Sequence, residues 1–210
     1  MKIEPKKISH LLFFFILLPL LSLVIAYFSN TVVQFFSKSY PSNWYFIFET
    51  LGVLGAYGLL YKLFDLYLWK YIPWNSFRVV EFPNLEGRWK GQIFTSYNNQ
   101  SSPIEAILEI KQTFSEINVC MYMKKSHSFS LHSGFIKEEA GKSALHFEYI
   151  NIPNTKAEDT MNPHFGTGNL TLQTNSDTLK GEYYNSPRFG RGHAGNYEFK
   201  FLDKKLKHSF

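Results

Sequence analysis

Near the C-terminal end of the sequence, six side chains combine cationic or titratable groups with phenol rings. They belong to His164, Tyr183, Arg188, Arg191, His193 and Tyr197. Arginine and histidine donate charge-assisted hydrogen bonds to phosphates, and tyrosine rings stack on planar groups. Five of the six share the parity of the apolar residues that must face inward, and Arg188 lies in a turn beside them. The set is therefore a candidate binding site for an anionic ligand that carries planar rings.

The other reactive side chains form no catalytic or metal-binding pattern. His127 and His132 are an odd number of residues apart, which places them on opposite faces of one strand. Cys120 is alone, so an internal disulfide and a thiolate metal cluster are both excluded. The sequence contains no nucleophile elbow and no helical histidine pair. We therefore expect no metal, no cofactor and no enzymatic activity.

Residues 190–195 spell G-x-G-x-x-G, the string found in dinucleotide-binding folds. Those folds need a strand before the string and a helix after it. Here an alternating strand follows, so the string does not indicate a Rossmann fold. Its glycines are instead expected to allow the backbone to bend at a barrel rim or to approach a ligand closely.

Alternating apolar and polar residues dominate the chain from residue 84 to residue 202. A first strand at 87–97 is followed by period-two runs at 104–110, 117–123, 129–135, 145–149, 168–172, 179–183 and 197–201. Eight strands joined by short turns favour an all-β, antiparallel, lipocalin-like barrel. A two-sheet sandwich is the alternative. Closure is favoured because it removes two long exposed edge strands.

Two apolar runs precede the strands. Residues 11–28 carry no charge, and residues 44–61 carry only Glu49. They predict two N-terminal transmembrane helices, at about 9–28 and 44–63. A secretory signal peptide is the alternative for the first run, but no small-residue cleavage pattern follows it. Lysines flank both runs, so the positive-inside rule places the N-terminus and the barrel in the cytoplasm.

The predicted organisation is therefore a transmembrane hairpin at 1–70, a linker at 71–83, a barrel at 84–202 and a basic tail at 203–210. Residues 82–202 hold 12 Lys and Arg against 12 Asp and Glu, so their net charge is zero. The excess of 22 basic over 17 acidic residues lies entirely outside that stretch. This distribution argues against a nucleic acid polymer as the partner.

The order of elements and several short motifs resemble one bacterial family. The motifs are Gly87-x-Trp89-x-Gly91, His164-x-Gly166-x-Gly168, Leu179-x-Gly181-x-Tyr183, and Arg188 followed by Gly-x-Gly. With two preceding apolar helices, they resemble the two-transmembrane β-barrel effectors of anti-phage cyclic-oligonucleotide signalling, known as the SMODS-associating 2TM β-strand-rich effector domain. The resemblance covers nearly the whole chain.

The resemblance implies a receptor in the bacterial inner membrane. A cyclic dinucleotide made by a partner cyclic-oligonucleotide synthase would bind the barrel, the receptors would form homo-oligomers, and the helices would disrupt the membrane in abortive infection. Tyr183 and Tyr197 could instead be ordinary barrel core. Arg191 could close the barrel end against Trp89. The alternative function is a membrane-tethered lipocalin-like carrier of an apolar ligand, or a structural membrane protein.

Overall fold

The computed structural model describes residues 13–36, 45–71, 80–96, 102–137, 143–157, 162–173, 177–186 and 192–210. The chain divides into two compact units, Met1–Glu81 and Phe82–Phe210.

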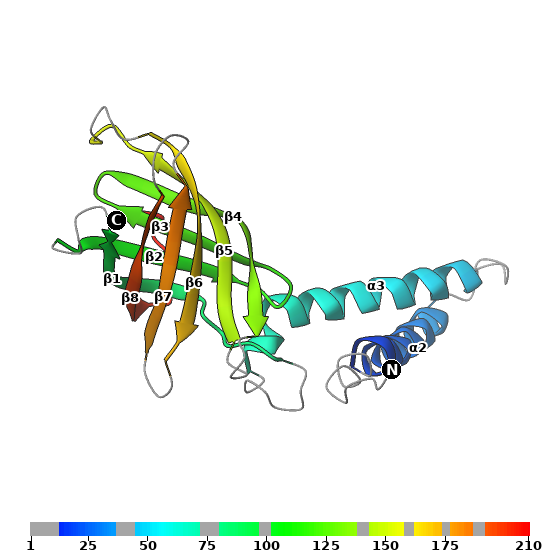
Figure 1. Ribbon diagram of the computed structural model, residues 1–210. Helices are drawn as coiled ribbons and strands as arrows, with labels where there is room; N and C mark the ends of the chain where they lie inside the picture. The colour runs from blue at the N-terminus through cyan, green and yellow to red at the C-terminus, as the bar shows by residue number, and fades with distance from the viewer. Residues whose placement is uncertain are drawn as a thin grey trace. The chain divides into compact units, whose positions relative to one another are not determined.

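The first unit is helical. Its elements are η1 (Phe13–Leu17), α2 (Leu18–Phe36), α3 (Tyr45–Leu66) and the short η3 (Leu68–Tyr71) (Figure 1). The helices α2 and α3 contact each other. The ring of Phe14 meets that of Phe64 nearly at right angles, with 5.5 Å between the ring centroids.

The prediction of two transmembrane helices is wrong. Within the described ranges, no helix is both long enough and apolar enough to cross a membrane. The helix α2 begins in the middle of the apolar run at 11–28 and continues through 29–34, which holds four polar residues. The helix α3 carries Glu49, Lys62 and Asp65. The predicted localisation, a multi-pass inner-membrane protein, is overturned by the same finding.

The second unit is a closed barrel in which every strand is antiparallel to its neighbours, with β8 pairing back onto β1. Its strands are β1 (Gly87–Thr95), β2 (Ile104–Gln112), β3 (Ile117–Met123), β4 (Ser126–Lys137), β5 (Ser143–Pro153), β6 (His164–Leu172), β7 (Thr178–Ser186) and β8 (His193–Asp203) (Figure 1). The predicted eight-stranded antiparallel barrel is confirmed. The closed strand order excludes the sandwich.

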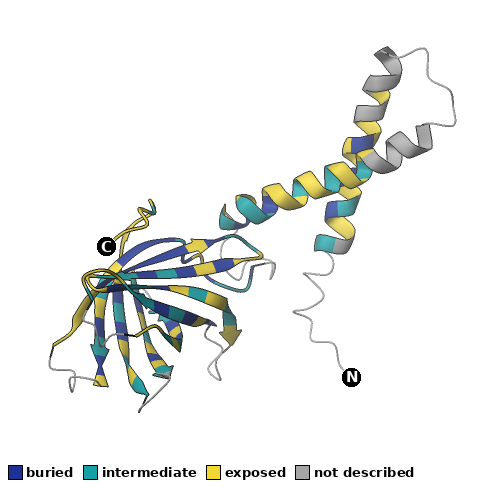
Figure 2. Ribbon diagram, turned by 90° about the horizontal axis from the view of Figure 1, so that it is seen from above, coloured by how far each residue is buried: buried dark blue, intermediate teal, exposed yellow. Residues whose placement is uncertain are grey.

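Alternation of side chains along each strand produces the barrel core. Figure 2 shows buried and exposed residues following one another along the strands. The inward positions include Leu108, Leu145, Leu170, Leu179 and Phe199, each of them fully buried. Removing these apolar groups from water is the main contribution to the stability of the unit.

One end of the barrel is sealed around Trp89. The indole Nε1 of Trp89 donates a hydrogen bond to the Leu85 carbonyl oxygen at 3.0 Å. The Phe201 ring lies edge-on to the indole, with 5.1 Å between centroids. The buried amide of Gln112 accepts from the Leu85 N–H at 2.7 Å and donates to the Pro83 carbonyl oxygen at 3.1 Å. Both atoms of this amide are satisfied, so the end is closed by packing and hydrogen bonds together.

Candidate functional site

A layer of three tyrosines occupies the opposite end of the barrel, which we call the tyrosine end. Tyr149 on β5, Tyr183 on β7 and Tyr197 on β8 are each at most 9% exposed. The rings of Tyr183 and Tyr197 are stacked, with 5.0 Å between centroids and 23° between planes. The Phe147 ring lies almost parallel to that of Tyr197 at 6.4 Å. The layer is thus a set of nearly parallel aromatic faces.

Hydrogen bonds join the phenol groups of this layer. Burial raises the pKa of Tyr197 well above its usual value, and its hydroxyl donates to Tyr149, which raises the pKa further. Burial also raises the pKa of Tyr149, although the bond from Tyr197 opposes this. Burial likewise raises the pKa of Tyr183, with a bond from Thr95 opposing it. All three phenols are therefore neutral at physiological pH and act as hydrogen-bonding groups.

Two glycines of β6 make room for the aromatic rings. A Cβ on Gly166 would lie 2.5 Å from both Cζ and Oη of Tyr149, and a Cβ on Gly168 would lie 2.5 Å from Cζ of Phe147. The rings of β5 therefore lie directly over the backbone of β6. The His164-x-Gly166-x-Gly168 motif has a packing reason, because side chains at the two glycines would displace the rings.

Polar side chains form the rim above the tyrosines. The inward-facing positions nearest this end are Thr95, Ser126, Asn151, His164, Asn185 and His193, by the alternation and register of the strands. In the strand register, Asn151 of β5 lies opposite His164 of β6, and Asn185 of β7 lies opposite His193 of β8. The Asn185 Oδ1 accepts from the His193 N–H at 2.9 Å, and the His164 Nδ1 lies 3.2 Å from the Asn162 carbonyl oxygen. The rim can therefore offer both donors and acceptors to a ligand.

Asn151 is a member of this rim that the sequence analysis missed. It is 5% exposed, and its Nδ2 donates to the Ser128 Oγ at 2.9 Å and to the Ser126 Oγ at 3.2 Å. Its Oδ1 is buried and has no hydrogen-bond partner among the described residues. The available signal was its parity, because it continues the inward series of Phe147 and Tyr149.

The structure brings four of the six predicted site residues to one end of the barrel. Tyr183 and Tyr197 lie in the layer, and His164 and His193 lie in the rim. Both histidines are half-buried. Arg188 and Arg191 lie outside the described residues. A role in ligand binding stays a prediction for all six.

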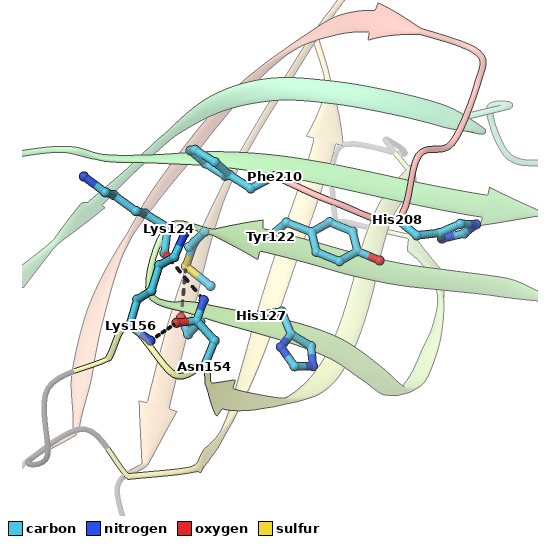
Figure 3. A pocket seen from close by; sticks show the side chains of 9 residues that line it. Tyr122, Lys124, His127, Asn154, Lys156, His208 and Phe210 are labelled. Carbon is cyan, nitrogen blue, oxygen red and sulfur yellow. Dashed lines mark hydrogen bonds between the residues drawn. The ribbon is translucent and has the colours of Figure 1, made fainter.

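A pocket of about 570 Å³ lies beside this rim, on the outer wall of the barrel. Its lining residues are Tyr122, Met123, Lys124, Ser126, His127, Asn154, Lys156, His208 and Phe210. Figure 3 shows Asn154 beside Lys124 and Lys156, with dashed lines for its hydrogen bonds. The Asn154 Nδ2 donates to the Lys124 carbonyl oxygen at 3.1 Å, and the Asn154 Oδ1 accepts from the Lys156 N–H at 2.9 Å. The pocket is rich in basic groups, but both lysine side chains are exposed to water.

A buried ion pair holds the C-terminal segment that forms one wall of this pocket. The Arg88 Nη1 lies 2.6 Å from the Glu109 Oε1, with both side chains almost completely buried. The same carboxylate accepts the backbone N–H groups of Lys207 at 2.8 Å and of His208 at 3.0 Å. His208 has a positive φ of 55°, which helps to direct successive N–H groups at one anion. These contacts hold the backbone of residues 207–208 at the Glu109 carboxylate on β2.

The described residues of the site contain no cluster that would bind a metal. Among the parts of the chain that the structure describes, no three His, Cys, Asp or Glu side chains lie close enough to share an ion.

An eight-stranded antiparallel barrel belongs to a class whose interior holds side chains or one small ligand. Comparison with known proteins identifies the family. Residues 80–200 match the family described as Cap15, cyclic dinucleotide receptor domain. The chain is also 30% identical, over 148 residues, to CD-NTase-associated protein 15 of Yersinia aleksiciae, covering 70% of this chain and 67% of that protein. The chain belongs to the Cap15 cyclic dinucleotide receptor family.

This membership decides two predictions. The resemblance to the β-barrel effectors of cyclic-oligonucleotide signalling is confirmed at the level of the family. The matched domain is a receptor domain, so the prediction that the protein is not an enzyme is also confirmed.

Proposed function

We propose that the tyrosine end of the barrel binds a cyclic dinucleotide produced by a CD-NTase, and that ligand binding drives homo-oligomerisation in anti-phage defence. The observation that carries the proposal is the layer of stacked tyrosines beneath a polar rim, in a chain that belongs to a cyclic dinucleotide receptor family. The name of the Yersinia relative supports the association with a CD-NTase.

The chemistry of a cyclic dinucleotide suits this end of the barrel. Such a ligand has two bases with flat aromatic faces and two phosphodiesters that each carry a negative charge. The bases would stack against the rings of Tyr183 and Tyr197. The phosphodiesters would accept hydrogen bonds from the imidazoles of His164 and His193, and from Arg188 and Arg191. The neutral tyrosine hydroxyls add no charge that would repel the phosphates.

A carrier of an apolar ligand is the second candidate function. The aliphatic and aromatic interior of the barrel favours it, because an apolar ligand gains from contact with such surfaces. The rim opposes it, since a purely apolar ligand would leave the buried Asn151 Oδ1 without a partner. We therefore favour the receptor. We leave membrane disruption out of the proposed function, because no described helix meets the requirements of a membrane span.

Calorimetric titration of the purified full chain tests the proposal. The probes are cyclic di-AMP, cyclic di-GMP, cyclic AMP–GMP and cyclic AMP–UMP, with palmitate as the apolar alternative. We expect saturable binding of at least one cyclic dinucleotide, which chromatography recovers intact. Binding of palmitate alone would favour the carrier.

Sedimentation velocity tests the assembly step separately. We expect the sedimentation coefficient to increase when the bound cyclic dinucleotide is added, and to stay unchanged with a cyclic dinucleotide that does not bind. If the sedimentation coefficient does not change when the protein is saturated with ligand, the protein is still a receptor, but its ligand does not drive oligomerisation.

A further inference from the structure

The amide of Asn151 is the one side chain at the tyrosine end, among the described residues, that keeps a fully buried polar atom without a partner. Its Nδ2 donates hydrogen bonds to the hydroxyls of Ser126 and Ser128 on the neighbouring strand β4. The two polar atoms lie at opposite corners of a planar amide, so Oδ1 points away from both serines. An acceptor of this kind, removed from water and left without a donor, costs free energy in the folded protein.

The position of Asn151 links this acceptor to the proposed ligand site. Asn151 follows Tyr149 by two residues on β5, so both side chains face the interior of the barrel. Its neighbour across the β5–β6 ladder is His164, another rim residue. The partnerless oxygen therefore lies one step above the tyrosine layer, where a stacked base would present its edge.

The sealed end of the barrel provides a direct contrast. The buried amide of Gln112 has partners for both its oxygen and its nitrogen, at 2.7 and 3.1 Å. The same fold thus fully satisfies a buried amide where it only supports structure. At Asn151 it holds the nitrogen in place and leaves the oxygen available.

We propose that the Asn151 Oδ1 accepts a hydrogen bond from an N–H group on one nucleobase of the bound cyclic dinucleotide, and so selects for a base edge that presents a donor there. The inference rests on the proposed function and assigns it a specificity residue. Amide side chains pair with base edges through such bonds in other recognition systems. A site built to bond a polar group rejects analogues that lack the group, because its own buried atom then stays unpaired.

The test measures affinity and stability together in the full chain, with Asn151→Leu and Gln112→Leu as matched variants. Each substitution replaces a buried amide by an apolar side chain. We expect Asn151→Leu to weaken binding of the tightest cyclic dinucleotide of the panel by about tenfold or more, with a small change in melting temperature. We expect Gln112→Leu to lower the melting temperature and leave the dissociation constant unchanged. Asn151→Ala gives the same comparison if leucine does not fit.

Ligand analogues complete the test. One donor group is removed from the tightest ligand: the amino group of adenine by placing purine, the N1–H of guanine by placing N1-methylguanine, or the N3–H of uracil by placing N3-methyluracil. We expect one analogue to bind the unchanged protein about tenfold more weakly, and Asn151→Leu to add no further loss. The inference would be overturned if the losses in affinity from the analogue and from Asn151→Leu multiplied, or if Asn151→Leu bound the ligand with full affinity. Either result would leave the proposed receptor function in place. Failure of the unchanged protein to bind any cyclic dinucleotide would overturn both.

Discussion

Tyr197 joins the packing of the barrel core to the chemistry of its tyrosine end. Its ring stacks on Tyr183, and its hydroxyl donates to Tyr149. It is only 4% exposed, so Tyr197 is part of the barrel core. The same ring also lies in the tyrosine layer that we propose as the binding face. A ligand stacked at this end would extend an aromatic layer that the folded protein already contains.

The buried phenols predict an alkaline limit to stability. Burial raises the pKa of Tyr149, Tyr183 and Tyr197 in the folded state, whereas the unfolded chain keeps ordinary values of about 10. Their contribution is therefore fully present below about pH 10 and is lost as pH rises through the folded values. We expect the free energy of unfolding in urea to be level at neutral pH and to fall above about pH 10.

Substitution separates this contribution from general alkaline damage. We expect Tyr197→Phe to make the alkaline fall shallower and to cost about 1 kcal/mol at neutral pH, since Tyr149 loses its donor. The control is Tyr184→Phe on the outer face of β7, because Tyr184 is 53% exposed. Equal slopes for Tyr197→Phe and the unchanged protein would contradict the assignment.

Arg188 and Arg191 are predicted phosphate contacts. We expect Arg188→Ala or Arg191→Ala to weaken cyclic dinucleotide binding by about tenfold or more, because a charge-assisted hydrogen bond is lost. The melting temperature should stay unchanged, and calorimetry with a thermal scan measures both. Lys124→Ala and Lys156→Ala, in the outer pocket, are the controls and should bind normally. A lowered melting temperature with unchanged affinity in Arg191→Ala would instead assign that residue to barrel closure.

At the scale of the strand, Gly166 sets the distance between β6 and the tyrosine layer. A Cβ there would collide with the Tyr149 ring, which its bond to Tyr197 holds in place. We therefore expect Gly166→Ala to lower the melting temperature by several degrees and to weaken ligand binding. Gly134, in β4, has nothing within 4 Å of its Cβ position. Gly134→Ala is the matched control and should not lower stability, and an equal loss from both would contradict a steric role.

The C-terminal segment is held by the buried pair of Arg88 and Glu109. We expect Glu109→Gln to cost about 3–5 kcal/mol in urea unfolding, because the Arg88 charge would stay buried without compensation. The backbone N–H groups of Lys207 and His208 would also lose an anionic acceptor, so proteases should cleave this segment faster. The control is Glu198→Gln, whose exposed pair with Lys180 is worth at most about 1 kcal/mol. Equal costs for the two variants would contradict the account.

For the molecule as a whole, period-two alternation predicted the eight strands because the inward face of a barrel must be apolar along every strand. The same parity placed Tyr183 and Tyr197 on one face. Asn151 was not predicted because a lone asparagine in a strand has no distinctive pattern. That its Oδ1 has no hydrogen-bond partner is visible only in three dimensions. The transmembrane helices were wrongly predicted because they were inferred from the apolar runs at 11–28 and 44–61. The helix α2 instead begins at Leu18 and includes a polar stretch, and α3 extends past the second run to Lys62 and Asp65.

Nuclear magnetic resonance of the full chain with labelled tyrosine rings tests the central claim most directly. The rings of Tyr183 and Tyr197 lie inside the tyrosine end, and the ring of Tyr122 lies in the outer pocket. On titration with the tightest cyclic dinucleotide, stacking predicts large ring-current shifts for Tyr183 and Tyr197 and little change for Tyr122. Shifts confined to Tyr122, or no saturable shift with any cyclic dinucleotide, would contradict binding at the tyrosine end.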